Sequence, residues 1–414
     1  MYLIGIKGIK YLLKLLGNPH NNYHTVHVGG TNGKGSTAAM INSILIKSGY
    51  KTGLFTSPYL EKFPERIKIN NEEISRDEIT SFIKKIIYKI EELSLTGFEK
   101  PTTFEIITTM CFDFFAKQNI DIGVMEVGLG GRFDATNVIT PSVSVITPIS
   151  FDHTNVLGNT IEEITYEKSG IIKKDGTTVV APQNREADEM IQRICKDRSN
   201  NLYRVNEDIK FQLKGSSLSG TVFDVQGLEN NYNDLKIKLI GEHQVINAAV
   251  AIGAIETLSM KGFHITKESI KTGLYETYWP GRMEIISKDP KILIDVAHNV
   301  HSMKILKNTI QNHMKYDNLI LVLGVLRDKN YPKMVKEIVP IANTVITVEP
   351  DSNRALKVED LVEEVKKYNC NCIIGKDIEK AIKKALEIAN EKDLICFAGS
   401  IYLAGKVRSR ILRK

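Results

Sequence analysis

The feature that most constrains the fold of this sequence is a glycine-rich stretch at residues 29–37, GGTNGKGST. It follows a short β-prone run at residues 25–28 and precedes a helix that we predict over residues 37–47. Glycines let backbone N–H groups turn toward an anion, the helix N-terminus adds partial positive charge, and Lys34 adds a full one. The stretch therefore predicts a phosphate-binding loop with these members: Asn32, Gly33, Lys34, Gly35, Ser36 and Thr37.

This loop departs from the strict Walker A pattern at two points. Position 28 is Val where that pattern has Gly, and Gly35 separates Lys34 from Ser36. A plain glycine-rich turn with an exposed lysine is the alternative, but the strand–loop–helix context favours a phosphate loop.

Strands and helices alternate along most of the chain, which favours an α/β fold with a parallel sheet. Buried-type strands are predicted at residues 120–127 and 142–148, whereas residues 200–240 resemble β-hairpins and precede a helix at 245–259. Pro280 and Gly281 interrupt this pattern. Further strands are predicted beyond them, at residues 291–296, 319–323, 344–348 and 394–397.

A chain of 414 residues exceeds what one hydrophobic core usually supports, about 250–300 residues. We therefore expect two domains. Residues 1–279 form a P-loop ATPase-like domain with a parallel sheet, residues 280–284 a hinge, and residues 285–414 a smaller Rossmann-like α/β domain.

Composition excludes several classes of protein. No apolar run approaches the roughly 20 residues of a membrane span, and we identify no signal peptide. The net charge of +6 is too small and too dispersed for a nucleic-acid surface. Five scattered cysteines predict reduced thiols and a cytoplasmic protein, and no second pair completes a metal site with Cys370 and Cys372.

Two polar residues follow predicted strands. Glu126 ends an apolar run and precedes VGLGGR, which suits an acid that holds Mg²⁺ beside a phosphate loop. His153 follows a strand at residues 144–149, at the end of a parallel strand where ligands bind in α/β folds. A surface acid and a structural histidine are the alternatives.

Lys168 occupies an unexpected position. It lies seven residues after Ile161, four after Ile164 and three before Ile171, so it shares their inward helix face. A buried ammonium pairs with an acid, loses its proton or is modified. A lysine that snorkels out at the helix end is the equally weighted alternative.

Further motifs recur along the chain in a fixed order. They are TSPYL at 56–60, TTFE at 102–105, EVGLGGRFDATN at 126–137, DH at 152–153, EKSGI at 167–171, GEHQVINA at 241–248, WPGR at 279–282, DVAHN at 295–299 and GS at 399–400. Together with the phosphate loop, the sequence resembles folylpolyglutamate synthase and dihydrofolate synthase of the Mur ligase superfamily. The resemblance runs from about Leu12 to the C-terminus.

The resemblance implies an ATP-dependent amide ligase with Mg²⁺ as its metal. A carboxylate of a reduced folate, or of dihydropteroate, is phosphorylated by ATP to an acyl phosphate, and the amine of L-glutamate attacks it. The implied partners are small molecules, with neither nucleic acid nor membrane, and the implied state is a monomer.

The resemblance also implies roles for individual residues. Nucleotide contacts fall to the phosphate loop and to Asn247, Arg282 and Asp295, and metal binding to Ser57, Glu126 and His153. Lys168 matches a lysine that such ligases carry as N6-carboxylysine, and His153 and His298 are its catalytic companions. The folate or pteroate side falls to Thr102, Thr103, Phe104, Glu105, Arg132 and Asp134, and the glutamate side to His298 and Ser400.

Several alternatives stay open. Ser57 suits a turn, Asn247 and Ser400 suit helix caps, and Phe104 suits a core position. Val296 stands where the family commonly has Gly, and the segment before Pro19 is shorter than usual. Another Mur-type ligase and a phosphate-loop switch protein are the competing functions, although no Asn-Lys-x-Asp motif for base recognition occurs.

Overall fold

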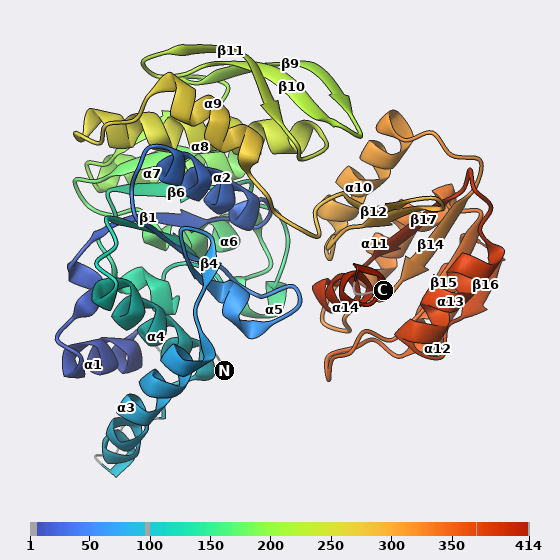
Figure 1. The fold of residues 1–414 in the computed structure, drawn as a ribbon, viewed down its shortest axis with the longest axis horizontal. Helices are drawn as coiled ribbons and strands as arrows, with labels where there is room; N and C mark the ends of the chain where they lie inside the picture. Colours follow the sequence, from blue (N-terminus) through green and yellow to red (C-terminus); the bar gives the residue numbers. More distant parts are fainter. Residues whose placement is uncertain (1–5, 96–99, 370, 413–414) are drawn as a thin grey trace.

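The computed structural model describes residues 6–95, 100–369 and 371–412, so Cys370 lies outside the described residues. Two α/β bodies lie side by side, and the chain passes between them once, from α9 (Lys267–Glu276) to β12 (Glu284–Lys288) (Figure 1). The predicted hinge at residues 280–284 lies at the end of this passage. In the described part of the chain, no helix has the length and apolarity needed to cross a bilayer.

An eight-stranded sheet forms the centre of the first body, in the order β4-β3-β2-β5-β1-β6-β7-β8. Its strands are β1 (His24–Gly29), β2 (Thr52–Phe55), β3 (Ile67–Ile69), β4 (Glu72–Glu73), β5 (Ile122–Glu126), β6 (Val143–Ile146), β7 (Thr177–Val180) and β8 (Asn201–Arg204). All neighbours pair in parallel except β3 with β2 and β4, which confirms the predicted parallel sheet.

One strand prediction is wrong. Residues 202–205 were expected in a hairpin, but β8 joins the large sheet as a parallel edge strand beside β7. The amphipathic helix α7 (Arg185–Asp197) supplies the crossover that two consecutive parallel strands require. Within the region predicted as hairpins, the antiparallel strands are β9 (Lys210–Ser217), β10 (Gly220–Gln226) and β11 (Asn231–Ile237), which form a separate three-stranded sheet.

Two helices of the first body are buried on nearly all sides. They are α2 (Lys34–Lys47) and α8 (Glu242–Met260), and their apolar residues join the large core under the β9–β11 sheet (Figure 1). Both begin three residues before their predicted starts. The earlier start of α2 matters, because it makes Lys34 the first residue of the helix rather than part of the loop.

The remaining helices of this body cover its other surfaces. A second core lies under α1 (Lys7–Leu15), α3 (Arg76–Leu95) and α4 (Thr103–Lys117). A third involves α5 (Thr154–Leu157), α6 (Ile161–Lys168) and α7.

The second body is a three-layer α/β domain. Its sheet has the order β12-β13-β17-β14-β15-β16, with β13 (Lys291–Ile294), β14 (Leu319–Leu323), β15 (Thr344–Thr347), β16 (Cys372–Ile374) and β17 (Leu394–Ala398) parallel and β12 antiparallel at one edge. One face packs on α10 (Val300–His313), α11 (Tyr331–Ile338) and α12 (Val358–Lys366), and the other on α13 (Ile378–Ile388) and α14 (Ile401–Leu412). The predicted Rossmann-like domain is confirmed, and each strand predicted there begins at its observed first residue.

Candidate active site between the two domains

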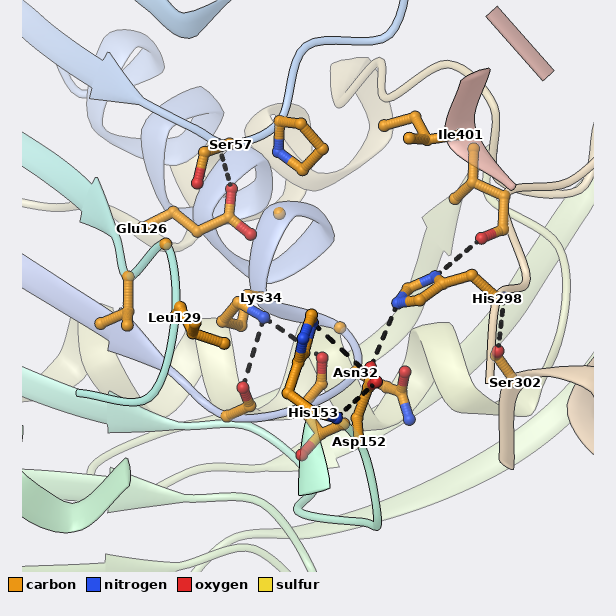
Figure 2. A pocket seen from close by; sticks show the side chains of 18 of the residues that line it. Asn32, Lys34, Ser57, Glu126, Leu129, Asp152, His153, His298, Ser302 and Ile401 are labelled. Atoms are coloured by element: carbon orange, nitrogen blue, oxygen red, sulfur yellow. Dashed lines mark hydrogen bonds and ion pairs between the residues drawn. The ribbon is translucent and has the colours of Figure 1, made fainter. Parts of the chain in front are cut away.

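A cavity of about 610 Å³ lies between the two bodies. The first body contributes its phosphate loop and the segments that follow β5 and β6, while the second contributes the segments that follow β13 and β17. Since ligands bind beyond the carboxyl ends of parallel strands, this is the expected place for a site. Figure 2 shows the side chains that converge there.

The phosphate loop has room for glycine alone at two positions. A Cβ on Gly30, whose φ is +133°, would lie 2.0 Å from Thr147 Oγ1. A Cβ on Gly33, whose φ is +88°, would lie 2.4 Å from Asn247 Oδ1. The Lys34 ammonium curls back over the loop and donates to the carbonyl oxygens of Gly30 at 3.3 Å and Thr31 at 3.2 Å.

The members of the predicted loop are not equally accessible. Asn32 through Ser36 line the cavity, but Thr37 is fully buried and does not. Thr37 is the fourth residue of α2, and its buried hydroxyl has no hydrogen-bond partner among the described residues, so a ligand contact from Thr37 stays a prediction.

Glu126 and Ser57 meet at the end of β5. The Ser57 backbone N–H donates to Glu126 Oε2 at 2.9 Å, while the buried Ser57 hydroxyl has no hydrogen-bond partner. Burial raises the pKa of Glu126, and the nearby charges of Lys34 and Arg282 oppose that rise. A carboxylate beside an unpaired hydroxyl is a set of hard oxygen donors, so these two residues fit a Mg²⁺ ion.

Lys168 is buried, with 4% of its surface exposed, which confirms the inward direction and excludes the snorkelling alternative. Its ammonium donates to the Gly30 carbonyl oxygen at 2.9 Å, and no ion pair with a carboxylate forms among the described residues. Burial, together with the charge of Lys34, lowers its pKa to about 7. An amine with such a pKa is largely neutral in mildly alkaline solution.

Asp152 is the centre of a polar cluster that joins the two bodies. Its carboxylate accepts hydrogen bonds from Lys329 Nζ at 2.6 Å and from Asn299 Nδ2 at 3.2 Å, and it lies 3.4 Å from His298 Nε2. Although burial alone favours the protonated acid, the hydrogen bond and charge of His298 and the charge of Lys329 lower the pKa of Asp152. All three partners come from the second body (Figure 2 shows His298).

His153 lies beside this cluster. Its Nε2 is 3.3 Å from Lys329 Nζ, and burial lowers its pKa to about 4 despite the charge of Asp152. A neutral imidazole is the form that binds a metal. Among the described residues, however, no three His, Cys, Asp or Glu side chains gather closely enough to hold one.

Lys329 was not predicted as a functional residue, and Asp152 had no predicted role of its own. Lys329 stands in an isolated LRDKN segment with no recognisable phosphate or metal pattern. Only the fold reveals it, by burying its side chain opposite Asp152.

The hinge brings Trp279 and Arg282 against the phosphate loop. A Cβ on Gly35 would lie 2.9 Å from the Trp279 ring, so the indole packs directly on the loop backbone. Arg282 is half-buried, desolvation lowers its pKa, and the charges of Asp295 and Glu126 oppose that effect. Asp295 is itself held by the backbone N–H groups of Met283 at 2.8 Å and Ala297 at 2.7 Å.

Asn247 lies in the interior of α8 rather than at its cap, so the capping alternative is excluded. Its amide donates to Gln244 Oε1 at 3.0 Å, and its oxygen faces Gly33. Ser400, in contrast, does cap a helix: its hydroxyl accepts from the Leu403 N–H at 3.2 Å, although the residue also lines the cavity.

The predicted folate side is brought together only in part. Thr102, Phe104, Glu105 and Asp134 line the cavity, whereas Thr103 and Arg132 do not. The Thr102 and Glu105 side chains cap the start of α4, and Glu105 also accepts from the Ile9 N–H at 3.0 Å.

Arg132 is directed elsewhere. Its guanidinium pairs with Glu167 at 2.5 Å and lies between the rings of Phe133 and Tyr166, at 4.3 and 4.8 Å from their centroids. These partners direct the guanidinium toward Glu167 and the two rings, and a substrate contact by Arg132 stays a prediction.

A phosphate loop, a buried lysine of low pKa and a Rossmann-like second body that meets them across a short hinge define a two-domain ligase of the Mur type. Two family models match: the Mur ligase middle domain over residues 28–255 and the Mur ligase glutamate ligase domain over residues 281–401.

Known relatives narrow the class. A dihydrofolate synthase/folylpolyglutamate synthase of Bacillus subtilis is 36% identical, over 98% of this chain and 95% of the relative. A solved structure, Mycobacterium tuberculosis folylpolyglutamate synthase complexed with ADP, has a TM-score of 0.93 at 30% identity and covers 99% and 95% of the two chains. Escherichia coli FolC in complex with DHPP and ADP has a TM-score of 0.89 at 26% identity, over 99% and 93% of the chains. The chain therefore belongs to the folylpolyglutamate synthase/dihydrofolate synthase family of ATP-dependent ligases.

Proposed function

We propose that this chain joins L-glutamate to the carboxylate of a reduced folate, with dihydropteroate as the second acceptor to be tested. The observation that carries this proposal is the position of Lys168, a buried lysine of low pKa that bonds to the phosphate loop at Gly30. The full-length similarity to dihydrofolate and folylpolyglutamate synthases supports the choice of substrates.

The chemistry requires ATP because a carboxylate is a poor electrophile. A carboxylate oxygen of the folate attacks the γ-phosphorus of ATP, the bond to the β-phosphate oxygen breaks, and ADP leaves. The glutamate amine then attacks the acyl carbon to give a tetrahedral intermediate. Inorganic phosphate departs with the electron pair of the C–O bond, and the nitrogen loses a proton as the amide forms.

The phosphate loop and Lys34 would bind the nucleotide phosphates through backbone N–H groups and the ammonium. Ser57 and Glu126 would hold Mg²⁺, with His153 as the weaker third candidate because Lys329 already occupies its Nε2 side. Bound Mg²⁺ supplies positive charge that reduces the repulsion between two anions, the γ-phosphate and the carboxylate.

Lys168 would act as N6-carboxylysine. A neutral amine adds CO₂, forms an N–C bond and releases one proton, which replaces a cation by a carbamate anion with two oxygens. The lowered pKa favours this step because only the neutral amine has a free electron pair. We assign the carbamate the role of orienting the metal and the incoming carboxylate.

The second domain would complete the site by rotation about residues 280–284, with 1–279 and 285–414 as the two moving parts. Arg282, Asp295 and Asn247 would contact the nucleotide. His298 and Ser400 would serve the glutamate or the transferring phosphoryl group, and Phe104 and Asp134 would contact the pterin-bearing substrate.

The test offers dihydropteroate and tetrahydrofolate separately with ATP, Mg²⁺ and L-glutamate, and follows product mass and phosphate release. We expect a mass gain of one glutamyl residue and phosphate release that requires both glutamate and the acceptor. Phosphate release indifferent to glutamate would instead support a phosphate-loop switch protein. Ligation of an unrelated acceptor alone would support another Mur-type ligase.

We also propose a monomeric enzyme of a reducing, cytoplasmic compartment. The four described cysteines, Cys111, Cys195, Cys372 and Cys396, are all free thiols, three of them buried. Light scattering and thiol titration of protein purified without reductant test these two points.

A further inference from the structure

Arg408 lies on α14 in the second domain, is not among the residues that line the cavity, and donates hydrogen bonds to three side chains. Its Nε donates to the Glu284 carboxylate at 2.9 and 3.1 Å, its Nη1 donates to Glu61 Oε1, and its Nη2 donates to the Tyr278 hydroxyl at 2.5 Å. The side chains of Arg408, Glu61 and Glu284 are 16%, 14% and 17% exposed. The Arg408 guanidinium is therefore largely buried and binds several acceptors, unlike an exposed surface ion pair.

These acceptors come from the first domain and from the hinge at residues 280–284. Tyr278 directly precedes the WPGR segment and Glu284 directly follows Met283, while Glu61 belongs to the first domain. Glu284 also accepts from the Gly281 N–H at 2.8 Å, so the same carboxylate holds the hinge backbone. Arg408 thus connects the end of the first domain, the start of the second and the turn between them.

The loop that carries Glu61, the first-domain partner, is held by several hydrogen bonds. The carboxylate of Glu65 accepts hydrogen bonds from the backbone N–H groups of Leu60, Glu61 and Lys62 at 2.8, 3.0 and 2.8 Å. The same loop begins at Ser57, whose N–H bonds to Glu126 in the candidate metal site. Glu61 and the candidate metal site are therefore connected by one short, hydrogen-bonded loop.

The backbone of α14 also touches this loop. A Cβ on Gly405 would lie 1.8 Å from the Leu60 carbonyl oxygen, so the helix and the loop meet without an intervening side chain. Such a close approach makes the contact sensitive to small rotations between the domains.

We propose that Arg408 is a positioning residue that fixes the angle between the two domains, and so sets where His298 of the second domain lies relative to the phosphate loop. The planar guanidinium addresses three acceptors at once, which the single ammonium of lysine cannot do in the same geometry. This inference rests on the proposed ligation between groups of both domains, but the domain angle itself is measurable without catalysis.

The test compares Arg408→Lys with a matched control on the same helix, Arg410→Lys. Arg410 pairs with Glu379 at 2.6 Å within the second domain, so its replacement leaves the hinge contacts intact. For Arg408→Lys we expect an increase of about tenfold or more in KM for glutamate with KM for ATP little changed, since one charge-assisted contact across the domains is lost. The control should match the wild type.

Small-angle X-ray scattering on the same proteins gives the readout that does not need activity. The wild type and Arg410→Lys should fit one compact arrangement of the domains, and Arg408→Lys should give a larger radius of gyration. Glu61→Gln, which alters only the first-domain partner, should reproduce the effect if Arg408→Lys does not fold. Unchanged scattering and an unchanged glutamate KM overturn the inference, as does an equal rise of both KM values with a lower melting temperature. If Arg408→Lys gives the expected larger radius of gyration but the wild type shows no ligase activity, the result would instead contradict the proposed function.

Discussion

Replacement of Lys168 by Met should abolish ligation and at the same time stabilise the first domain. The reason is that folding lowers the pKa of this lysine from 10.5 to about 7, chiefly through burial. The unfolded chain then binds more protons than the folded one between these two pKa values, so the stability of the wild type rises with pH through this window. Methionine has a similar length and carries no charge to desolvate.

The size of the effect follows from the shift. The shift means that placing Lys168 in the folded protein lowers the free energy of unfolding by about 5 kcal/mol at pH 6 and about 3 kcal/mol at pH 8. The lost hydrogen bond to Gly30 offsets about 1 kcal/mol, and the carbonyl keeps Lys34 as a donor at 3.3 Å. We therefore expect Lys168→Met to be more stable by about 4 kcal/mol at pH 6 and about 2 kcal/mol at pH 8.

The measurement is urea unfolding at both pH values in buffer freed of CO₂, so that the wild-type amine stays unmodified. Trp279 is the single tryptophan of the chain and packs on Gly35, so its fluorescence reports the phosphate loop and hinge. Lys174→Met is the matched control, because Lys174 is exposed six residues away and its replacement should change stability little.

Two results would refute the reasoning. One is a Lys168→Met variant less stable than the wild type at both pH values. The other is a stability difference that does not shrink between pH 6 and pH 8. Either would mean that the folded protein accommodates the ammonium, and that burial does not prepare the amine for carboxylation.

Three other outcomes are expected. Wild-type activity should fall in CO₂-free buffer and return with bicarbonate, whereas Lys168→Met stays inactive; activity indifferent to CO₂ contradicts the carbamate. Arg282→Ala should raise KM for ATP far more than KM for glutamate in steady-state assays, and an unchanged ATP value would separate the hinge from the nucleotide. Ser57→Ala should raise the Mg²⁺ concentration needed for half-maximal rate by about tenfold, measured by titration after EDTA treatment, and an unaltered requirement would remove Ser57 from the metal site.

Features set by local sequence were predictable. The phosphate loop depends on glycines and a helix start within nine residues. Helix periodicity placed Lys168 on the inward face with Ile161 and Ile164, but only its burial in the fold excluded the equally weighted snorkelling alternative. Strand positions in the second domain were also recognisable, since short apolar runs bounded by polar residues specify buried parallel strands.

Features that depend on distant segments were not predictable. Lys329 meets Asp152 across 177 residues, and Arg408 meets Glu61 across 347. The resemblance placed Arg132 near the substrate, but the rings beside it and Glu167 determine where its guanidinium points. Sequence motifs identify a position on the chain, whereas the direction of a long side chain depends on neighbours that only the fold supplies.

At the domain boundary, acidic residues of the first domain lie near basic residues from the hinge and the second domain. Asp152 of the first domain pairs with Lys329 and Glu61 pairs with Arg408, while the charge of Arg282 acts on Glu126, so each of these three acids lies near a cation from beyond residue 279. Approach of the domains thus replaces the hydration of each acid by a specific cation. Because these pairs are largely buried, salt screens them less than surface charges. The overall charge of +6 is therefore a poor guide to this molecule, since what joins its halves is the pairing of acids in one domain with cations in the other.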